Sequence, residues 1–160
     1  MAILTNSGRL VIAKIMKSLP FYLAWGEGDA AWDENFMQPT STNMALVNEI
    51  GRREANIVEY CTPDENGTID VSSGKFSPSE TETLYIHLRF DFTLADSPSR
   101  VIRECGVFVG TEIKTDTPAD IRYFLPEHIQ KPGSLVMVER FVALNLATDF
   151  RRSFDFVITL

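Results

Sequence analysis

The sequence predicts an α+β fold: a mainly antiparallel, sandwich-like β-sheet, an N-terminal helix packed on the sheet, and long loops. Apolar residues recur at helical spacing from about Asn6 to Leu19. From Thr83 to Phe92 apolar and polar residues alternate, which places one face of a strand in the core and the other in water. The same alternation returns between Phe154 and Leu160. One-sided strands of this kind are typical of antiparallel sheets, and an early helix that covers one face completes the α+β class.

The N-terminal helix has clear start and stop signals. Three polar residues can cap its first turn, namely Thr5, Asn6 and Ser7. Pro20 ends the helix, because proline cannot continue the helical hydrogen-bond ladder. The aromatic and aliphatic run from Phe21 to Trp25 then predicts a strand.

The segments after this strand are less regular. Gly26 to Asp29 predicts a turn. Residues Ala30 to Thr42 predict a long ordered loop, because their aromatic content is unusual for a disordered linker. Met44 to Arg53 is expected to form a short helix.

The middle of the chain predicts a hairpin. Asn56 to Cys61 and Thr68 to Val71 have the composition of strands. Asp64 to Gly67 lies between them and supplies the Asn-Gly pair that favours a tight turn.

The second half of the chain predicts further sheet. Val101 to Val109 and Leu135 to Leu146 are strand candidates with irregular alternation, which indicates bulges. Glu112 to Gly133 is rich in Pro, Thr and Asp and is expected to be mostly loop.

Composition restricts the possible partners. A chain of 160 residues predicts one domain over residues 1–160. The net charge of −7 argues against nucleic-acid binding, which needs a basic surface, and against docking on an anionic membrane. No apolar run approaches the roughly 20 residues that span a bilayer. Two cysteines are too few for a disulfide scaffold, so we expect a soluble protein made in a reducing cytoplasm.

The sequence predicts no catalytic, cofactor-binding or metal-binding residues. His87 and His128 are the only histidines, and neither has a second ligand at metal-binding spacing. His87 is expected on the wet face of its strand. Cys105 is expected to pack as a small buried apolar group, and Cys61 is the better candidate for exposure.

Two acidic clusters have residue types found in functional sites, and each also has a simpler structural explanation. Carboxylate pairs serve glycoside hydrolysis, but we favour a solvated acidic loop for the cluster Glu27, Asp29, Asp33 and Glu34. The spacing from Asp64 to Asp70 faintly resembles a calcium loop, yet Gly67 is misplaced for one, so a plain hairpin is favoured.

The aromatic loop supplies the candidate interface residues. Trp25 is expected in the core. Trp32, Phe36 and Met37 are of the residue types that anchor protein interfaces when exposed. Simple local packing explains them equally well, and the sequence leaves both roles open.

Several sparse markers occur in a characteristic order along nearly the whole chain. They are Thr5-Asn6-Ser7-Gly8, then Trp25-Gly26-Glu27-Gly28-Asp29, then Leu46-Val47-Asn48-Glu49 with Arg52 or Arg53, then Ile102-Arg103-Glu104-Cys105-Gly106-Val107-Phe108, and a closing pair of strands from Gly133 to Leu160. This set resembles the attachment domain of phage tail-collar and tail-fibre proteins, which fixes a fibre to the baseplate.

The resemblance implies a structural virion protein of a phage tail, either a baseplate component or an adaptor that joins a tail fibre to the baseplate. It implies no enzymatic activity and no cofactor. The expected partners are other tail, baseplate or fibre proteins, contacted in multiple copies, with no nucleic acid and no membrane. The resemblance also implies that the protein is made in the host cytoplasm and is located in the virion tail. The surfaces expected to contact partners are the sheet edges, the aromatic loop from Trp32 to Met37 and the Pro-rich segment from Thr115 to Pro132.

Two other functions remain open at this stage. One is a carbohydrate- or receptor-binding module at the tail tip that uses exposed Trp and Tyr. The other is a cell-wall hydrolase that uses the carboxylates around Glu27 and Asp29.

Overall fold

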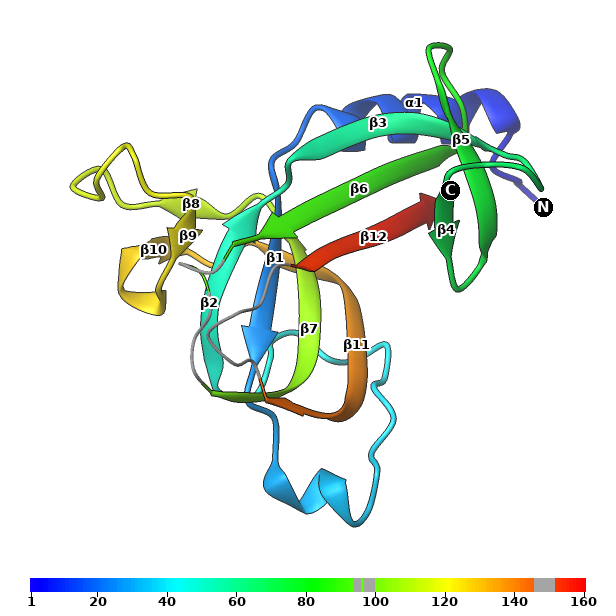
Figure 1. The fold of residues 1–160 in the computed structure, drawn as a ribbon. Helices are drawn as coiled ribbons and strands as arrows, with labels where there is room; N and C mark the ends of the chain where they lie inside the picture. The colour runs from blue at the N-terminus through cyan, green and yellow to red at the C-terminus, as the bar shows by residue number, and fades with distance from the viewer. Residues whose placement is uncertain (94–95, 97–99, 146–151) are drawn as a thin grey trace. The chain divides into compact units, whose positions relative to one another are not determined.

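The computed structural model describes residues 1–93, 96, 100–145 and 152–160, and the chain forms two compact units (Figure 1). Unit 1 comprises residues 1–19, 55–91 and 153–160, and unit 2 comprises residues 20–54 and 92–152. The strands pair antiparallel, and an α-helix lies at the N-terminus. The predicted α+β class, mainly antiparallel with an N-terminal helix and long loops, is confirmed.

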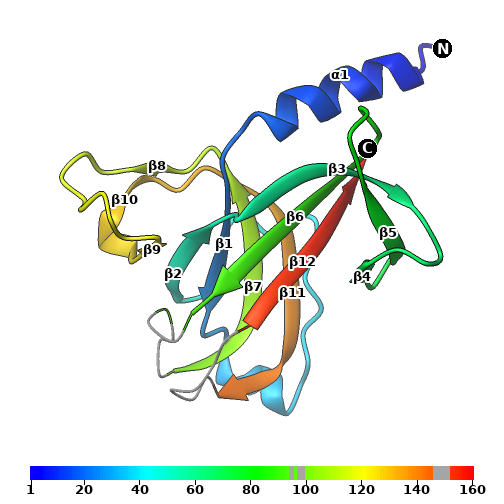
Figure 2. The same ribbon diagram turned by 45° about the horizontal axis from the view of Figure 1, so that its top comes forward.

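Unit 1 consists of a helix and a five-stranded sheet in the order β12-β6-β3-β5-β4. Figure 2 shows β6 between β3 and β12. The elements are α1 (Asn6–Lys17), β3 (Ile57–Pro63), β4 (Ile69–Val71), β5 (Gly74–Ser79), β6 (Tyr85–Phe92) and β12 (Arg152–Thr159).

Helix α1 begins and packs as its sequence indicates. The Thr5 hydroxyl accepts a hydrogen bond from the Gly8 N–H at 3.2 Å, which identifies Thr5 as the cap. On the side facing the sheet, Ala13 is fully buried, and the Lys17 ammonium lies 5.1 Å from the centre of the Tyr60 ring. Among the described helices, none has the length and apolar character needed to span a bilayer.

The alternating segments are strands with one buried face. Ile86, Leu88 and Phe90 of β6 are fully buried, as the period of two predicted. Phe156 of β12 packs edge-on against Phe90, with 6.1 Å between ring centres. The expected C-terminal strand is therefore confirmed.

Unit 2 is built around a five-stranded sheet in the order β11-β7-β1-β2-β9, accompanied by the two-stranded β10-β8. All residues of the central strand β1 are buried, and the sheet packs Ala24, Leu46 and Phe108 into one apolar cluster. The elements are β1 (Phe21–Gly26), β2 (Glu49–Glu54), β7 (Val101–Val109), β8 (Glu112–Ile113), β9 (Tyr123–Phe124), β10 (Ile129–Lys131), β11 (Ser134–Asn145) and the 3₁₀ helices η1 (Ala30–Asp33) and η3 (Pro126–His128). Two register shifts confirm the predicted bulges in β11, whereas β7 pairs with β1 without a register shift.

The helix predicted from Met44 to Arg53 is wrong. The segment turns at Asn48, which has a φ of 51°, and then forms strand β2. Leu46 and Ile50 are both buried, and their spacing of four residues imitates a helical face. Hydrogen bonding of β2 to β1 on one side and to β9 on the other outweighs this local pattern.

The predicted pairing of the strands around the Asn-Gly turn is also wrong. Strand β5 lies between β3 and β4, so the turn from Asp64 to Gly67 links two strands that do not pair. Gly67 is required there because a Cβ would lie 2.2 Å from the Phe76 carbonyl oxygen. The hairpin in this region joins β4 to β5 instead, with Val71 opposite Gly74.

The expectation of one domain over residues 1–160 stays a prediction, and the path of the chain supports it. The chain passes between the units after residues 19, 54, 91 and 152, so neither unit is a continuous stretch. We expect heating to unfold the protein in a single transition whose calorimetric and van't Hoff enthalpies agree. Two separate transitions in differential scanning calorimetry would instead identify the units as independent domains.

Candidate functional site

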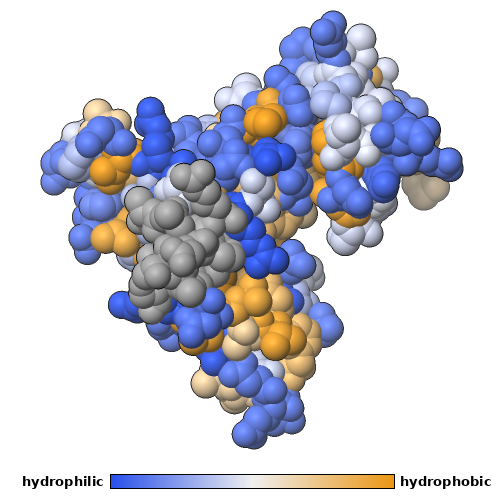
Figure 3. Space-filling model, in the orientation of Figure 1, coloured by the Kyte–Doolittle hydropathy of each residue, from blue (hydrophilic) through white to orange (hydrophobic). Residues whose placement is uncertain are grey.

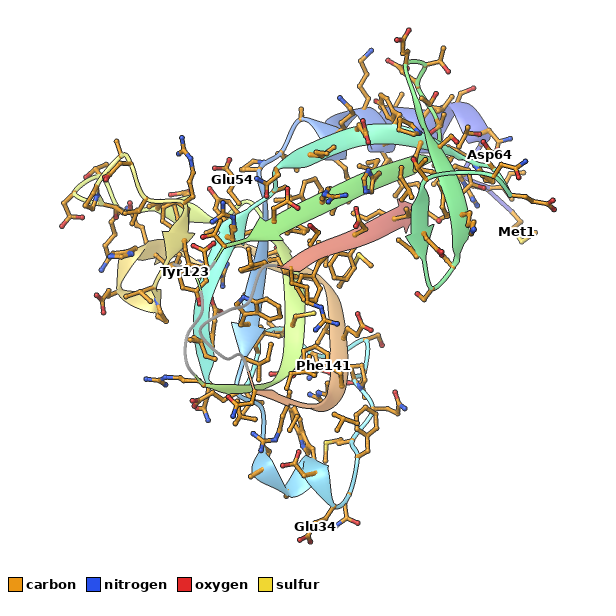
Figure 4. The ribbon with its side chains drawn as sticks, viewed as in Figure 1. Met1, Glu34, Glu54, Asp64, Tyr123 and Phe141 are labelled. Atoms are coloured by element: carbon orange, nitrogen blue, oxygen red, sulfur yellow. The ribbon has the colours of Figure 1, made fainter. Side chains whose placement is uncertain are left out.

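The segment from Asp29 to Asn48, here called the 29–48 loop, contains the three predicted interface residues. It connects β1 to β2 within unit 2 and begins with η1 (Figure 1). The Asp29 carboxylate caps η1 by accepting a hydrogen bond from the Ala31 N–H at 2.9 Å. Glu34, labelled in Figure 4, lies toward the far end of the loop.

Trp32 packs against the base of the loop and is only 8% exposed. Gly28 has a φ of 66° and makes room for the indole, since a Cβ there would lie 2.6 Å from a ring carbon of Trp32. The Arg140 guanidinium lies 4.0 Å from the centre of the Trp32 ring, in cation–π geometry. Of the two roles left open for Trp32, local packing is the one observed.

The Arg140–Glu104 ion pair connects the sheet to the loop. The two residues face each other across β11 and β7, their side chains are 5% and 1% exposed, and Arg140 Nε donates to Glu104 Oε2 at 3.1 Å. Arg140 also donates to the carbonyl oxygens of Met37 and Gln38 at 3.2 and 3.3 Å. The other Glu104 oxygen, Oε1, accepts a hydrogen bond from the Val47 N–H. One buried pair therefore fixes the middle and the end of the loop.

A second arginine fixes the start of the loop. Arg103 donates to both carboxylate oxygens of Asp33, at 2.8 and 2.7 Å, and to the Glu27 carbonyl oxygen at 3.1 Å. The hydrogen bonds from Arg103 lower the pKa of Asp33. This bidentate pairing holds the Arg103 guanidinium and the Asp33 carboxylate in a defined relative orientation.

Three markers of the resemblance meet at this loop base, although they are far apart in the sequence. Gly28 belongs to the Gly26–Asp29 turn, Val47 and Asn48 to the Leu46–Glu49 segment, and Arg103 and Glu104 to the Ile102–Phe108 strand. The Glu27 and Gly28 N–H groups donate to the Asn48 and Val47 carbonyl oxygens at 3.1 Å each.

The loop's remaining apolar side chains face solvent. Phe36 is 47% exposed and Met37 is 57% exposed, although the Met37 backbone is held by Arg140. The space-filling view shows a hydrophilic loop tip with apolar residues beside it along unit 2 (Figure 3). The structure therefore brings Trp32, Phe36 and Met37 together in one loop but buries the first and exposes the other two.

Arg52, one of the two arginines named as alternatives in the third sequence marker, organises the opposite end of unit 2. Arg52 is 2% exposed, its Nε donates to a Glu49 oxygen at 2.5 Å, and its guanidinium lies 3.7 Å from the centre of the Phe108 ring. It also donates to the Thr111 hydroxyl at 2.7 Å and to the Pro132 carbonyl oxygen. These contacts hold both ends of the segment from β8 to β10 against the sheet.

His87 is not a surface residue, which corrects the prediction. Its side chain is 3% exposed and lies between two carboxylates, with Nδ1 2.9 Å from Glu59 and Nε2 2.7 Å from Asp155. Strands β3 and β12 on either side of β6 supply these carboxylates, so the predicted wet face is partly covered by neighbouring strands. Cys61 is also fully buried, contrary to expectation, whereas the predicted burial of Cys105 is confirmed.

Three of the four acidic residues in and beside the loop are engaged with nearby groups, and the fourth, Glu34, is exposed. Glu27 pairs with Arg100 at 3.2 Å, Asp33 pairs with Arg103, and Asp29 caps η1. The Asp64 carboxylate, considered above for calcium, accepts hydrogen bonds from the Asn66 N–H and the Ser77 hydroxyl instead. Within the part of the chain that the structure describes, no group of three or more His, Cys, Asp and Glu residues is placed to hold a metal ion.

A cleft of about 860 Å³ lies beside β2 and β9 in unit 2. Its charged lining includes Arg53 and Asp96, which pair with each other at 2.5 Å. The hydroxyl of Tyr123, another lining residue, has no hydrogen-bond partner among the described residues.

The chain matches one protein family over residues 1–160, described as baseplate wedge 3 tail fiber network component, and it belongs to that family. The expected phage baseplate and tail-fibre family is thereby confirmed. The protein is a structural component of the tail-fibre network, with other baseplate or tail proteins as partners and the virion tail as its location. No curated protein matches the chain.

Replacing Arg140 tests the support of the loop. We expect Arg140→Ala to lower the free energy of unfolding by about 3–5 kcal/mol, because it leaves the Glu104 charge buried without its partner. The matched variant Arg100→Ala removes the surface pair with Glu27 and should change the free energy of unfolding by less than about 1 kcal/mol. Urea denaturation measures both. Equal effects of the two variants would contradict the role assigned to Arg140.

The two cysteines should resist alkylation in the folded protein. Burial raises the pKa of the Cys61 thiol to about 11 and raises that of Cys105 as well. At about pH 8, roughly one Cys61 thiol in a thousand is then ionised, and the thiolate is the reactive form. Iodoacetamide labelling followed by mass spectrometry should show modification only after unfolding in urea. Rapid labelling of native Cys61 would contradict the buried position.

Proposed function

We propose that this member of the baseplate wedge 3 tail fiber network family is a non-enzymatic adaptor that joins a tail fibre to the baseplate. Repeated copies bury the exposed side chains of the 29–48 loop, with Phe36 and Met37 as anchors, in neighbouring tail proteins. The observation that carries this proposal is a loop with a fixed backbone and solvent-facing apolar side chains.

A fixed loop lowers the entropic cost of binding. Each flexible segment that becomes ordered in a complex reduces the affinity, so a loop already held by Arg140, Arg103 and Glu104 keeps more of its contact energy. Phe36 and Met37 are types of side chain that are enriched in interface cores. The loop needs no rearrangement of its backbone to present them.

The alternative functions have less support. A carbohydrate-binding module needs exposed aromatic platforms, whereas both tryptophans are buried and the tyrosines are buried or half-buried. A hydrolase needs a proton-donating carboxylate beside a second one, and in this loop Glu27 and Asp33 are paired with arginines. The net charge of −7 favours proteins over nucleic acid or anionic membrane as partners.

Substituting the anchors should prevent assembly while leaving the fold intact. We expect the double variant Phe36→Ser, Met37→Ser to fall at least about tenfold in its incorporation into phage particles, because each anchor contributes on the order of 1 kcal/mol or more. The control Val142→Ser changes an apolar residue that is 79% exposed on β11, outside the loop. Incorporation is measured by quantitative immunoblotting of purified particles, and immuno-electron microscopy locates the chain at the fibre base.

Circular dichroism of the purified variants should show unchanged melting temperatures, since Phe36, Met37 and Val142 are all exposed. Normal incorporation of the double variant would refute the loop as the interface. Absence of the wild-type chain from disrupted particles would refute the adaptor function as a whole.

A further inference from the structure

The outer face of α1 carries an apolar stripe that the fold of unit 1 does not use. Val11 and Ile15 are each 58% exposed, and Leu19 just beyond the helix is 39% exposed. Residues four apart lie on one face of a helix, so these side chains are neighbours. The helix meets the sheet through Ala13 and Lys17, on its other side.

The stripe continues past the start of the helix. Leu4 is 57% exposed and lies over Gly8, where a Cβ would be 2.9 Å from the Leu4 methyl carbon. Positions 4, 8, 11, 15 and 19 repeat at steps of three and four residues, which is the spacing of a seam between two packed helices. The missing Cβ of Gly8 lets the Leu4 side chain lie against the first turn.

The charged side chains on the helix itself are all positive. Residues 1–26 contain three cationic side chains, Arg9, Lys14 and Lys17, and none of the chain's 22 carboxylates. With 3.6 residues per turn, Arg9 and Lys14 lie on opposite sides of the stripe. Lys14 remains 69% exposed even though it pairs with Glu82 at 2.8 Å. A partner that covers the stripe therefore meets Arg9 along one border and the Lys14–Glu82 pair along the other.

We propose that this stripe is a second docking surface, and that its occupant is an amphipathic helix with acidic borders in another baseplate protein. Two copies of α1 packed on each other would set cations against cations with no carboxylate on either helix, so charge disfavours a second copy as the occupant. An acidic helix supplies both the apolar seam and the opposite charge. This inference deepens the proposed function and rests on it for the location of the partner.

A peptide titration tests the chemistry of the surface without requiring the virion. The probes are two fluorescent helical peptides of about 21 residues, or three heptads, with the same Leu seam and with either Glu or Lys on its borders. We expect the Glu peptide to bind the full chain and the Lys peptide not to bind. The double variant Val11→Ser, Ile15→Ser should weaken binding at least about tenfold, because it removes two central anchors. The control Val142→Ser should bind as the wild type does.

Failure of the Glu peptide to bind would overturn the proposal. Equal binding of the Lys peptide, or unchanged binding by the double variant, would also overturn it. Circular dichroism checks that the double variant is folded, which is expected because both side chains are exposed.

Photo-cross-linking in intact particles identifies the occupant. A photoreactive residue is placed at position 15 in one strain and at position 36 in another, and the cross-linked peptides are sequenced by mass spectrometry. We expect position 15 to label an acidic amphipathic helix of a different protein. Three results would overturn the proposal: a cross-link to a second copy of this protein, a cross-link within the same molecule, or a cross-link to a basic segment.

Position 36 separates the two hypotheses. A cross-link at position 36 with none at position 15 leaves the proposed function standing and refutes the second surface. No cross-link at either position, in particles that contain the chain, counts against both.

Discussion

The buried pair of Arg140 and Glu104 is the constraint on which the candidate site depends. Two opposite charges that are almost inaccessible to water are tolerated only when each is paired and its remaining hydrogen-bonding capacity is used. Here that capacity is used on the 29–48 loop, because Arg140 donates to two loop carbonyl oxygens and Glu104 accepts the Val47 N–H. The loop cannot move away from β7 and β11 without exposing the pair or leaving it unsatisfied. Its conformation is thus a consequence of sheet pairing rather than of its own irregular sequence.

Much of the fold could be predicted, because periodicity records which face of an element is buried. The α1 helix and strand β6 have patterns long enough to be read locally, and the structure confirms both. Strand β2 differs from the predicted helix because it is short, and because Leu46 before it and Ile50 within it are buried at helical spacing. Its strand geometry comes from pairing with β1 and β9. His87 was missed for a related reason. A period of two indicates that one face of a strand is polar. Whether a side chain on that face is exposed to water depends on the side chains of the neighbouring strands.

The candidate site was predictable in composition and not in geometry. An aromatic loop with Trp32 and Phe36 stands out in a sequence, yet which of them is buried depends on Arg140, which lies more than 100 residues away along the chain. The markers of the resemblance contain more of this information. Gly28 and Arg103 belong to separate motifs, and both contact the start of the loop. Sparse markers that are unremarkable singly can therefore encode one local structure when each fixes a different part of the same loop.

The uneven distribution of charge bears on how the proposed adaptor would join different proteins. An adaptor fails if its copies pair with each other through the surfaces meant for its partners. The first 26 residues are purely cationic, while the remainder of the chain is strongly acidic. On the proposal made above, the cations of α1 disfavour pairing between copies of the helix and favour an acidic partner. The 29–48 loop presents anchors of another kind, which are apolar side chains on a backbone held by Arg140 and Arg103. Two surfaces with different chemistry can bind two different proteins at once, and that property is what a joint in a fibre network requires.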